Sequence, residues 1–332
     1  MLTKTALLPL LSPRDTSIET RAQIDRLSEE LASGRGSDTG RALRADFSGF
    51  SRAAHALRTL EARETALSRG ASWLSAAQDA LATLETAGAA VSQGFGATFF
   101  GGTAADLSAL AGIASGRLSD ALSALSGTHG GRALFANGDA SGAAPLDTAT
   151  FLSDIETLAR GSGDPGSLLQ AFDSYFTPGG GFDLVLSGAP PDPVRISLGE
   201  GTALEVPLAL GDPEIRTMLR DLAVVASLDE AGFAMGAGEL NTLGLELPRR
   251  AAEGQAALAR KRGEVGAVEA RVDDLADRLA QDRLRFEQER SDAVGVDAFD
   301  VANRLQNEMT RLETIYSVTA RRSRLRLTDY LR

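Results

Sequence analysis

The chain has 332 residues, 43% of them hydrophobic and only 5% aromatic, and its formal net charge is −11. An acidic balance of this size argues against nucleic acid as a partner, because phosphate backbones bind basic surfaces. Cysteine is absent, so a disulfide framework is excluded in any compartment.

No run of residues approaches the ~20 consecutive apolar residues that cross a bilayer, so we expect no membrane partner. The first residues, MLTKTALLPLLSPRD, contain a short apolar run that Pro9 interrupts. No small-residue cleavage site follows this run, and we therefore expect no cleaved signal peptide.

The N-terminal part of the sequence predicts helices. A first helix is expected from Asp15, a capping residue, through Leu31 to a stop at Gly34. A much longer helix is expected from Arg41 to about Val91, and a shorter one from Ala104 to Ser126. Residues 133–135 then read as a brief strand, followed by a turn at Asn137-Gly138.

The middle of the chain mixes helices with short strands. The pattern predicts helices over 151–158 and 167–176, and a further helix that Asp212-Pro213 opens and that runs to about Leu228. Strands are expected over 182–186, 194–198 and 203–208, joined by GGG, APPDP and GEG turns. These elements form an α+β module inserted between helical arms.

Past Pro248 the helical pattern resumes until the segment DAVGVD, and Asp297 or Asp300 starts a last helix. The predicted fold is therefore mainly α, with long helical coiled-coil arms from both termini that form a discontinuous helical domain. We expect terminal helices in 1–40 and 297–332, a long helical bundle in 41–130 and 248–296, and the hairpin-like segment with the α+β module in 131–247.

Apolar residues at both ends follow the spacing of a helix–helix seam. Ile24, Leu27 and Leu31 step by three and four, and Leu305, Met309, Leu312, Tyr316 and Thr319 step by four, three, four and three. Such a narrow stripe fits another helix, as in a coiled coil. An assembling protein can use terminal helices of this kind, because packing against neighbouring copies stabilises helices that are only marginally stable alone.

Residues for catalysis or cofactor binding form no recognisable pattern. The only histidines are His55 and His129, and without cysteine no nitrogen–sulfur metal ligand set exists. The sequence has no G-x-S-x-G, no phosphate-binding loop and no dinucleotide-binding glycine pattern. We expect no enzyme, no catalytic residue, no metal and no cofactor, although carboxylate pairs need no local motif.

Three segments, in this order, resemble the flagellin family. LSEELASGRGSD (27–38) is similar to the turn between that family's first two helices, and GRALFANGDASGAAP (131–145) looks like the point where its helical core gives way to an outer domain. The segment from Val296 to Arg332 resembles the family's C-terminal helix and ends on Leu327, Asp329, Tyr330 and Leu331. Within the family, the segment PVRISLGEGTALEVPLALGDPEI looks most like the compact outer domain of the hook-associated proteins at the hook–filament junction.

This resemblance implies a structural subunit of the bacterial flagellum, exported unfolded through the flagellar type III system and transiently cytoplasmic beforehand. The terminal helices would pack against other copies in a ring and against a neighbouring hook-associated protein and flagellin, and the α+β module would face outward as a small outer domain. An export chaperone is a further expected partner. The implied assembly interface comprises Ile24, Leu27, Leu31, Leu305, Met309, Leu312, Tyr316, Leu327, Tyr330 and Leu331.

Other functions stay open at this point. Flagellin, the bulk subunit of the filament, propagates an open helix of copies, whereas a junction protein stops after one or two layers. A non-flagellar coiled-coil scaffold would use the same apolar seams within one chain. An enzyme would need a deep polar pocket with converging carboxylates in the α+β module.

Overall fold

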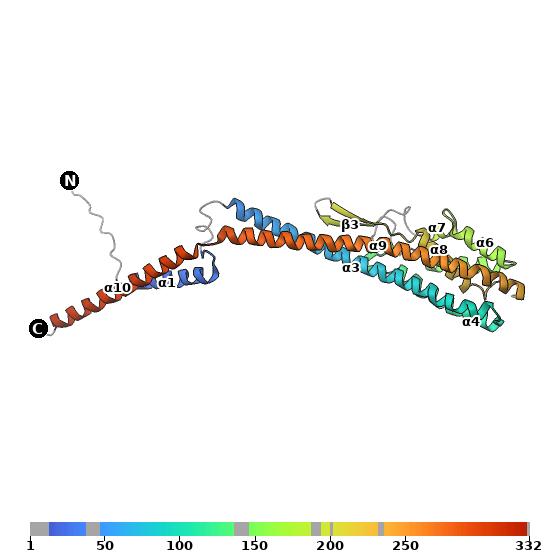
Figure 1. The fold of residues 1–332 in the computed structure, drawn as a ribbon, viewed down its shortest axis with the longest axis horizontal. Helices are drawn as coiled ribbons and strands as arrows, with labels where there is room; N and C mark the ends of the chain where they lie inside the picture. Colours follow the sequence, from blue (N-terminus) through green and yellow to red (C-terminus); the bar gives the residue numbers. More distant parts are fainter. Residues whose placement is uncertain are drawn as a thin grey trace. The chain divides into compact units, whose positions relative to one another are not determined.

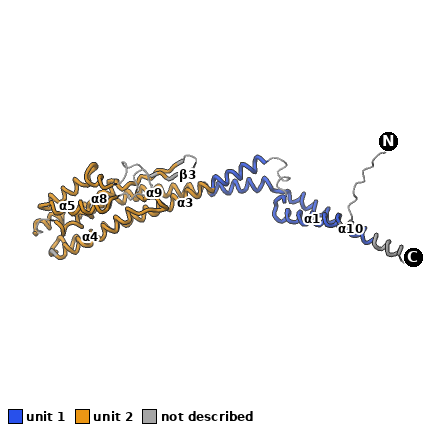
Figure 2. Tube along the Cα trace, turned by 180° about the vertical axis from the view of Figure 1, so that it is seen from behind, with its two compact units in different colours: residues 1–60, 280–332 blue, residues 61–279 orange. Residues whose placement is uncertain are grey.

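The computed structural model describes residues 13–37, 47–135, 146–186, 194–199, 202–231 and 236–330 of the chain. It is mainly α, and its helices and strands follow one another as Figure 1 shows. Contacts divide the chain into two compact units, one of residues 1–60 and 280–332 and the other of residues 61–279 (Figure 2). Both units include part of the two longest helices, α3 (Ser48–Phe99) and α9 (Ala237–Val294).

The first unit contains the terminal helices α1 (Pro13–Ser33) and α10 (Ala298–Tyr330), which are in contact. The expected helix ends are confirmed here. Gly34 follows α1 with a φ of +66°, a conformation that favours glycine and stops a helix. The Asp297 carboxylate accepts the backbone N–H of Phe299 at 2.8 Å, so Asp297 is the residue that starts α10.

In the second unit α3 and α9 run antiparallel. Gln78 donates to the carbonyl of Arg262 at 3.0 Å, and further along α3 Ser92 accepts from Gln255 at 3.1 Å. Buried side chains recur along both helices at steps of three and four, which is the spacing of a helix–helix seam. They include Leu67, Leu74, Leu81 and Leu84 of α3 and Leu258, Val265, Val268 and Val272 of α9.

Helix α9 begins at Ala237 and contains Pro248 in its interior. The prediction that the helix resumes only after Pro248 was therefore wrong. A proline inside a helix removes one backbone hydrogen bond and costs about 3 kcal/mol. Leu243, Leu247 and Ala251 are buried on both sides of Pro248, and each large apolar side chain contributes about 1.5–3 kcal/mol on burial, which offsets that cost.

A short helix and a hairpin follow α3. Helix α4 (Ala104–Leu125) begins with a capping box in which Thr103 and Asp106 each bond the other's backbone N–H. The strands β1 (Thr128–His129) and β2 (Arg132–Ala133) pair antiparallel across a turn in which Gly130 and Gly131 have φ of +58° and +78°. The predicted strand over 133–135 begins earlier and ends at Ala133, and the predicted turn at Asn137-Gly138 lies outside the described residues.

The middle of the second unit is built mostly of helices. These are α5 (Thr148–Arg160), α6 (Pro165–Phe176), α7 (Gly181–Val185) and α8 (Pro213–Ala226), and one antiparallel hairpin accompanies them, β3 (Val194–Gly199) with β4 (Thr202–Val206). Asp164-Pro165 and Asp212-Pro213 open α6 and α8 with proline in the first turn, where its missing N–H costs nothing.

The predicted strand over 182–186 was wrong, because residues 181–185 form the helix α7. Phe182 and Val185 are buried while Leu184 is 86% exposed, so the buried positions are three apart, as in a helix, and do not alternate. The Asp183 carboxylate accepts the Gly179 N–H at 2.6 Å and holds this turn. Phe182 packs with Phe151, Tyr175 and Phe176 in an aromatic cluster that joins α5, α6 and α7.

Candidate assembly interface

The terminal helices α1 and α10 run antiparallel, and the chain segments that follow α1 and precede α10 hold them together. Arg35 and Gly295 form an antiparallel bridge. Beside it, Gly36 donates its N–H to the carbonyl of Val294 at 3.0 Å and Val296 donates to Gly34 at 3.1 Å. At the other end of the contact, Arg21 of α1 meets Tyr316 of α10. The chain itself therefore fixes the register of the two helices.

Few side chains of this pair are buried. Thr20 and Leu27 are buried on α1, and Val301 is the one buried residue of α10 among those whose side chains are described. Leu305, Glu308, Leu312 and Ile315 continue the line from Val301 at steps of four, three, four and three, and each is half-buried. Two helices alone cannot enclose a core, so this line remains partly open to solvent.

The structure divides the predicted seam residues into three groups. Leu27 is buried, and Ile24, Leu305 and Leu312 are half-buried in the contact between α1 and α10. Leu31 is 38% exposed, Met309 53% and Tyr316 43%, and Thr319 is also exposed. The side chains of Leu327 and Tyr330, and all of Leu331, lie outside the described residues.

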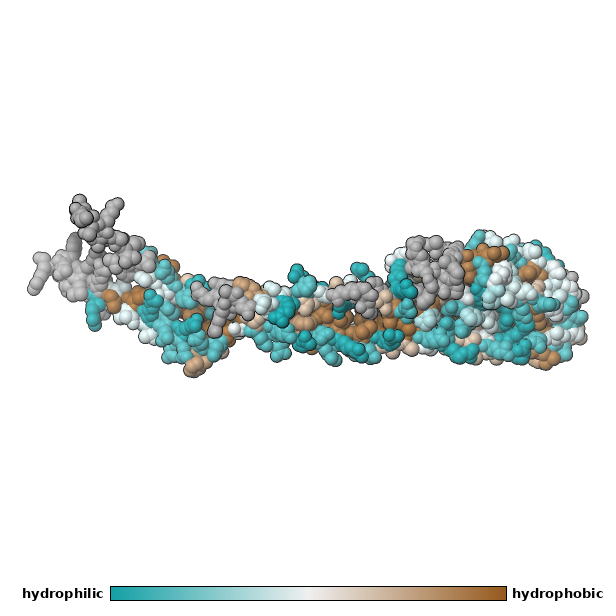
Figure 3. Space-filling view, turned by 90° about the horizontal axis from the view of Figure 1, so that it is seen from above, coloured by the Kyte–Doolittle hydropathy of each residue, from teal (hydrophilic) through white to brown (hydrophobic). Residues whose placement is uncertain are grey.

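Met309 and Tyr316 mark an apolar strip of which α1 covers only a part. Each follows a half-buried leucine, Leu305 or Leu312, by four residues, which is a rotation of about 40° around the helix axis. The apolar stripe of α10 is therefore wider than the face that α1 covers. Figure 3 shows hydrophobic side chains lying among hydrophilic ones on this helix pair.

Tyr316 combines this exposure with a fixed position. The guanidinium of Arg21 lies 5.6 Å from the centre of its ring and donates a hydrogen bond to its hydroxyl. A cation over an aromatic ring contributes about 0.5–1 kcal/mol at an exposed site. Arg21 thus orients the tyrosine ring on α10 while the rest of the ring remains accessible.

A hydrogen-bonded turn closes the C-terminal end of α1. The Glu30 carboxylate accepts both the backbone N–H and the hydroxyl of Ser37, the first at 2.9 Å. These bonds hold the pKa of Glu30 below its usual range. Because Ser37 follows the bridge between Arg35 and Gly295, the contact secures the backbone that sets the register of α1 and α10.

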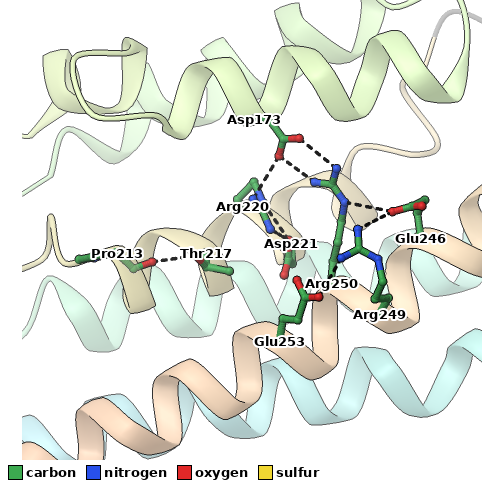
Figure 4. A network of polar contacts seen from close by, with 9 residues as sticks. All are labelled: Asp173, Pro213, Thr217, Arg220, Asp221, Glu246, Arg249, Arg250 and Glu253. Atoms are coloured by element: carbon green, nitrogen blue, oxygen red, sulfur yellow. Dashed lines mark hydrogen bonds and ion pairs between the residues drawn. The ribbon is translucent and has the colours of Figure 1, made fainter.

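A second cluster of charges lies in the other unit and is internally paired (Figure 4). The Asp173 carboxylate of α6 accepts hydrogen bonds from both terminal guanidinium nitrogens of Arg250 of α9, at 2.7 and 2.9 Å. A guanidinium nitrogen of Arg220 of α8 lies 3.1 Å from the same carboxylate. Burial alone would raise the pKa of Asp173, but the two arginines lower it below its usual range. Burial raises the pKa of Asp221, which Arg220 contacts at 2.8 Å.

This network joins helices, and its carboxylates face basic side chains of the same chain. The same holds for Asp183, which pairs with Arg216, and for Asp212, which lies 3.3 Å from Lys261. Charge pairs of this kind position helices relative to one another. Among the described residues, no three histidine, aspartate or glutamate side chains come together as metal ligands.

The described helices include none long and apolar enough to cross a membrane.

Comparison with protein-family models gives no match, and comparison with curated protein sequences finds no significant relative.

Sequence reasoning missed two features of the helix pair. The contact of α10 with α1 uses Val301, Glu308 and Ile315, which the predicted stripe left out. The spacing could have predicted Val301 and Ile315, because Val301 lies four residues before Leu305 and Ile315 lies three residues after Leu312. Arg21 and Tyr316 are 295 residues apart in the sequence, and no local pattern predicts their contact.

Proposed function

We propose that the chain is a structural subunit of the bacterial flagellum, of the hook-associated type that joins hook to filament. The observation that carries this proposal is the incompletely covered pair of terminal helices. Its apolar strip, with Met309 and Tyr316, lies where a neighbouring helix would complete the packing. The order of the resembling segments along the chain supports the same assignment.

The energetics of the terminal helices favour assembly. Burying a large apolar side chain stabilises by about 1.5–3 kcal/mol, and Met309 and Tyr316 are exposed by 53% and 43%. Covering the exposed halves of these two side chains in a neighbouring copy would contribute about 1.5–3 kcal/mol per subunit contact. Helices that are marginal alone and ordered after assembly also suit export of an unfolded chain through the type III channel.

The proposal assigns a role to each part of the chain. Residues 1–40 and 297–332 form the assembly core, 41–130 and 248–296 the long helical bundle, and 131–247 the small α+β outer domain. The partners are other copies in a ring, a neighbouring hook-associated protein, flagellin and an export chaperone. The chain acts as a structural component outside the cell and catalyses no reaction.

Two other functions fit part of the same observations. Flagellin would use the same terminal helices but polymerise without limit, because its heterologous contacts repeat along an open helix. A coiled-coil scaffold outside the flagellum would need no neighbouring helix beside Met309 and Tyr316. The exposed apolar strip favours the two assembling alternatives over the scaffold.

Electron microscopy tests the proposal. The purified full-length protein is placed under polymerising conditions, alone and with the flagellin of its host, and its position in cells is determined with a labelled antibody. A junction protein forms no long filaments alone and is found at the base of the filament. Long filaments from the protein alone would identify flagellin, and a location away from the flagellum would refute the proposal.

A further inference from the structure

A cleft in the second unit gathers positive charge in a chain that is acidic overall. Helix α3 and the hairpin of β1 and β2 enclose a cavity of about 440 Å³, a size within the usual range of binding sites. Its lining includes Arg69, Arg132, His129, Ser68, Ser72 and Trp73. No carboxylate is among the described residues that line it, although the chain has 45 acidic and 34 basic side chains.

The hairpin holds two of these side chains in fixed positions. His129 and Arg132 are directly opposite each other in the register of β1 and β2. Positive φ at both Gly130 and Gly131 gives the tight two-residue turn that matches the twist of the strands. Opposed side chains of an antiparallel pair lie about 5 Å apart, so His129 and Arg132 project together beside the cleft.

The hydrogen bonds around the cleft leave its guanidinium groups available to an anion. The indole N–H of Trp73 donates to the carbonyl of Ala133 at 3.3 Å and fixes the floor to the hairpin. Arg132 donates to the carbonyl of Arg195 at 3.3 Å, a neutral acceptor. Neither Arg69 nor Arg132 makes an ion pair within the described part of the chain, unlike Arg220 and Arg250 of the same unit.

Helix α9 carries the complementary charge. Asp273 and Asp277 are exposed, make no ion pair with other described residues and lie four residues apart on one helix face. Like charges at this spacing weaken a helix by about 0.2–0.5 kcal/mol, a cost that an approaching cation removes. Ala270 is exposed on this face, and its small side chain allows close approach.

We propose that the cleft of one copy receives the Asp273–Asp277 face of α9 from a second copy. The occupant follows from charge complementarity, since the cleft and the acidic face belong to one unit of the same molecule but do not line each other. A contact between two different surfaces of identical chains is heterologous, so it orders successive copies in one direction. The proposal goes beyond the flagellar assignment, because it holds for any assembly of this chain.

The absence of native cysteine permits a specific cross-linking test. Full-length Ser68→Cys and full-length Ala270→Cys, one of them tagged, keep every charge and are mixed under mild oxidation. We expect a disulfide between the two different proteins at ~0.05 M salt and a clear loss of it at ~0.5 M salt, where exposed charges are screened. Ser115→Cys, at an exposed position of α4, replaces Ser68→Cys in the control mixture.

Charge exchange provides a second measurement by sedimentation of the full-length proteins. Arg69→Glu with Arg132→Glu, and separately Asp273→Arg with Asp277→Arg, should each weaken self-association at least about tenfold, because like charges then oppose each other. Mixing the two variants should restore association, since the acidic cleft now meets a basic helix face. Circular dichroism checks that both variants keep their helix content.

Cross-linking no stronger than the Ser115→Cys control overturns the proposal, and so does a mixture of the exchanged variants that stays as weak as each alone. A cleft that binds a small oxyanion without any cross-link would also overturn it. Failure of the flagellar assignment has a different signature, because the cross-link would form in vitro while the protein lies away from flagella in cells.

Discussion

Met309→Asp should weaken assembly while leaving the fold of the isolated chain largely intact. Met309 is 53% exposed in the chain itself, so its removal costs the isolated protein little. Its replacement by aspartate lowers helix propensity by about 0.5 kcal/mol and places a carboxylate where it can stay in water. We therefore expect less than about 1 kcal/mol of destabilisation of the isolated chain.

In the assembled state the same change has a much larger effect. A neighbouring helix that covers Met309 gains the remaining half of its burial, about 1 kcal/mol. An aspartate at that position loses this gain. Its carboxylate would also be buried without a partner, which costs a further ~1–3 kcal/mol. The sum, about 2–4 kcal/mol per contact, corresponds to a loss of roughly 30-fold to several hundred-fold in association.

The assay compares assembly and folding of the same variants. Incorporation into flagella is scored by immunolabelling, and thermal unfolding of the purified chain is followed by circular dichroism. Asn307→Asp is the matched control, because it adds the same carboxylate at an exposed position on another side of α10, and Met309→Leu conserves volume. Normal incorporation of Met309→Asp, or equal losses with Asn307→Asp, would refute the role of this strip in assembly.

Three further predictions concern stability. Phe151→Ala removes a fully buried ring that contacts Tyr175, Phe176 and Phe182 and should lower the free energy of unfolding by about 3–5 kcal/mol. Denaturant unfolding measures this loss, and a loss below ~1 kcal/mol would contradict the packing. Asp297→Ala removes the cap of α10 and should cost about 1 kcal/mol, with Asp297→Ser retaining most of it in the same thermal assay. Asp173→Asn should cost about 1–2 kcal/mol at pH 7, less than a fully buried pair because the carboxylate side chain is 39% exposed. Arginines lower the folded-state pKa of Asp173, so its stabilisation exists above the unfolded pKa of about 4 and disappears as the pH falls through the lower folded value. A stability difference from the wild type that does not shrink as the pH is lowered would refute this.

The helices of the fold could largely be predicted from the sequence, because local signals determine them. Steps of three and four between apolar residues mark α3, α4 and α9, and Asp-Pro pairs mark the starts of α6 and α8. Glycine with positive φ ends α1. Each of these signals lies within a few residues of the boundary it sets, so no knowledge of the tertiary structure is required.

The errors occurred where tertiary contacts outweigh local preference. FDLVL is a short apolar run between turn signals, which is typical of a strand. However, Phe182 and Val185 are buried together, Phe182 in the aromatic cluster, and Arg216 pairs with Asp183. These contacts select a helical turn for α7. Pro248 is a strong local signal for a helix start, but buried side chains on both sides of it keep α9 continuous.

The sequence predicted the apolar stripe of the candidate interface, but it predicted only some of the residues with which α10 contacts α1. The heptad spacing identifies an apolar side of α10 but does not specify which part of it the chain's own α1 covers. That choice depends on register, which the bridge between Arg35 and Gly295 sets far from either stripe. The sequence therefore could not separate half-buried Leu305 and Leu312 from exposed Met309 and Tyr316.

The two terminal helices differ physically from the helices of the second unit, and the difference bears on function. Nine of the 14 residues of α8 are buried, because α4, α6 and other elements surround it. In α10, Val301 alone is buried among the residues whose side chains are described. The described side chains of this 33-residue helix therefore gain little stability from packing within the chain. Under the proposed function, a neighbouring helix that covers Met309 and the exposed part of Tyr316 would supply further packing for α10.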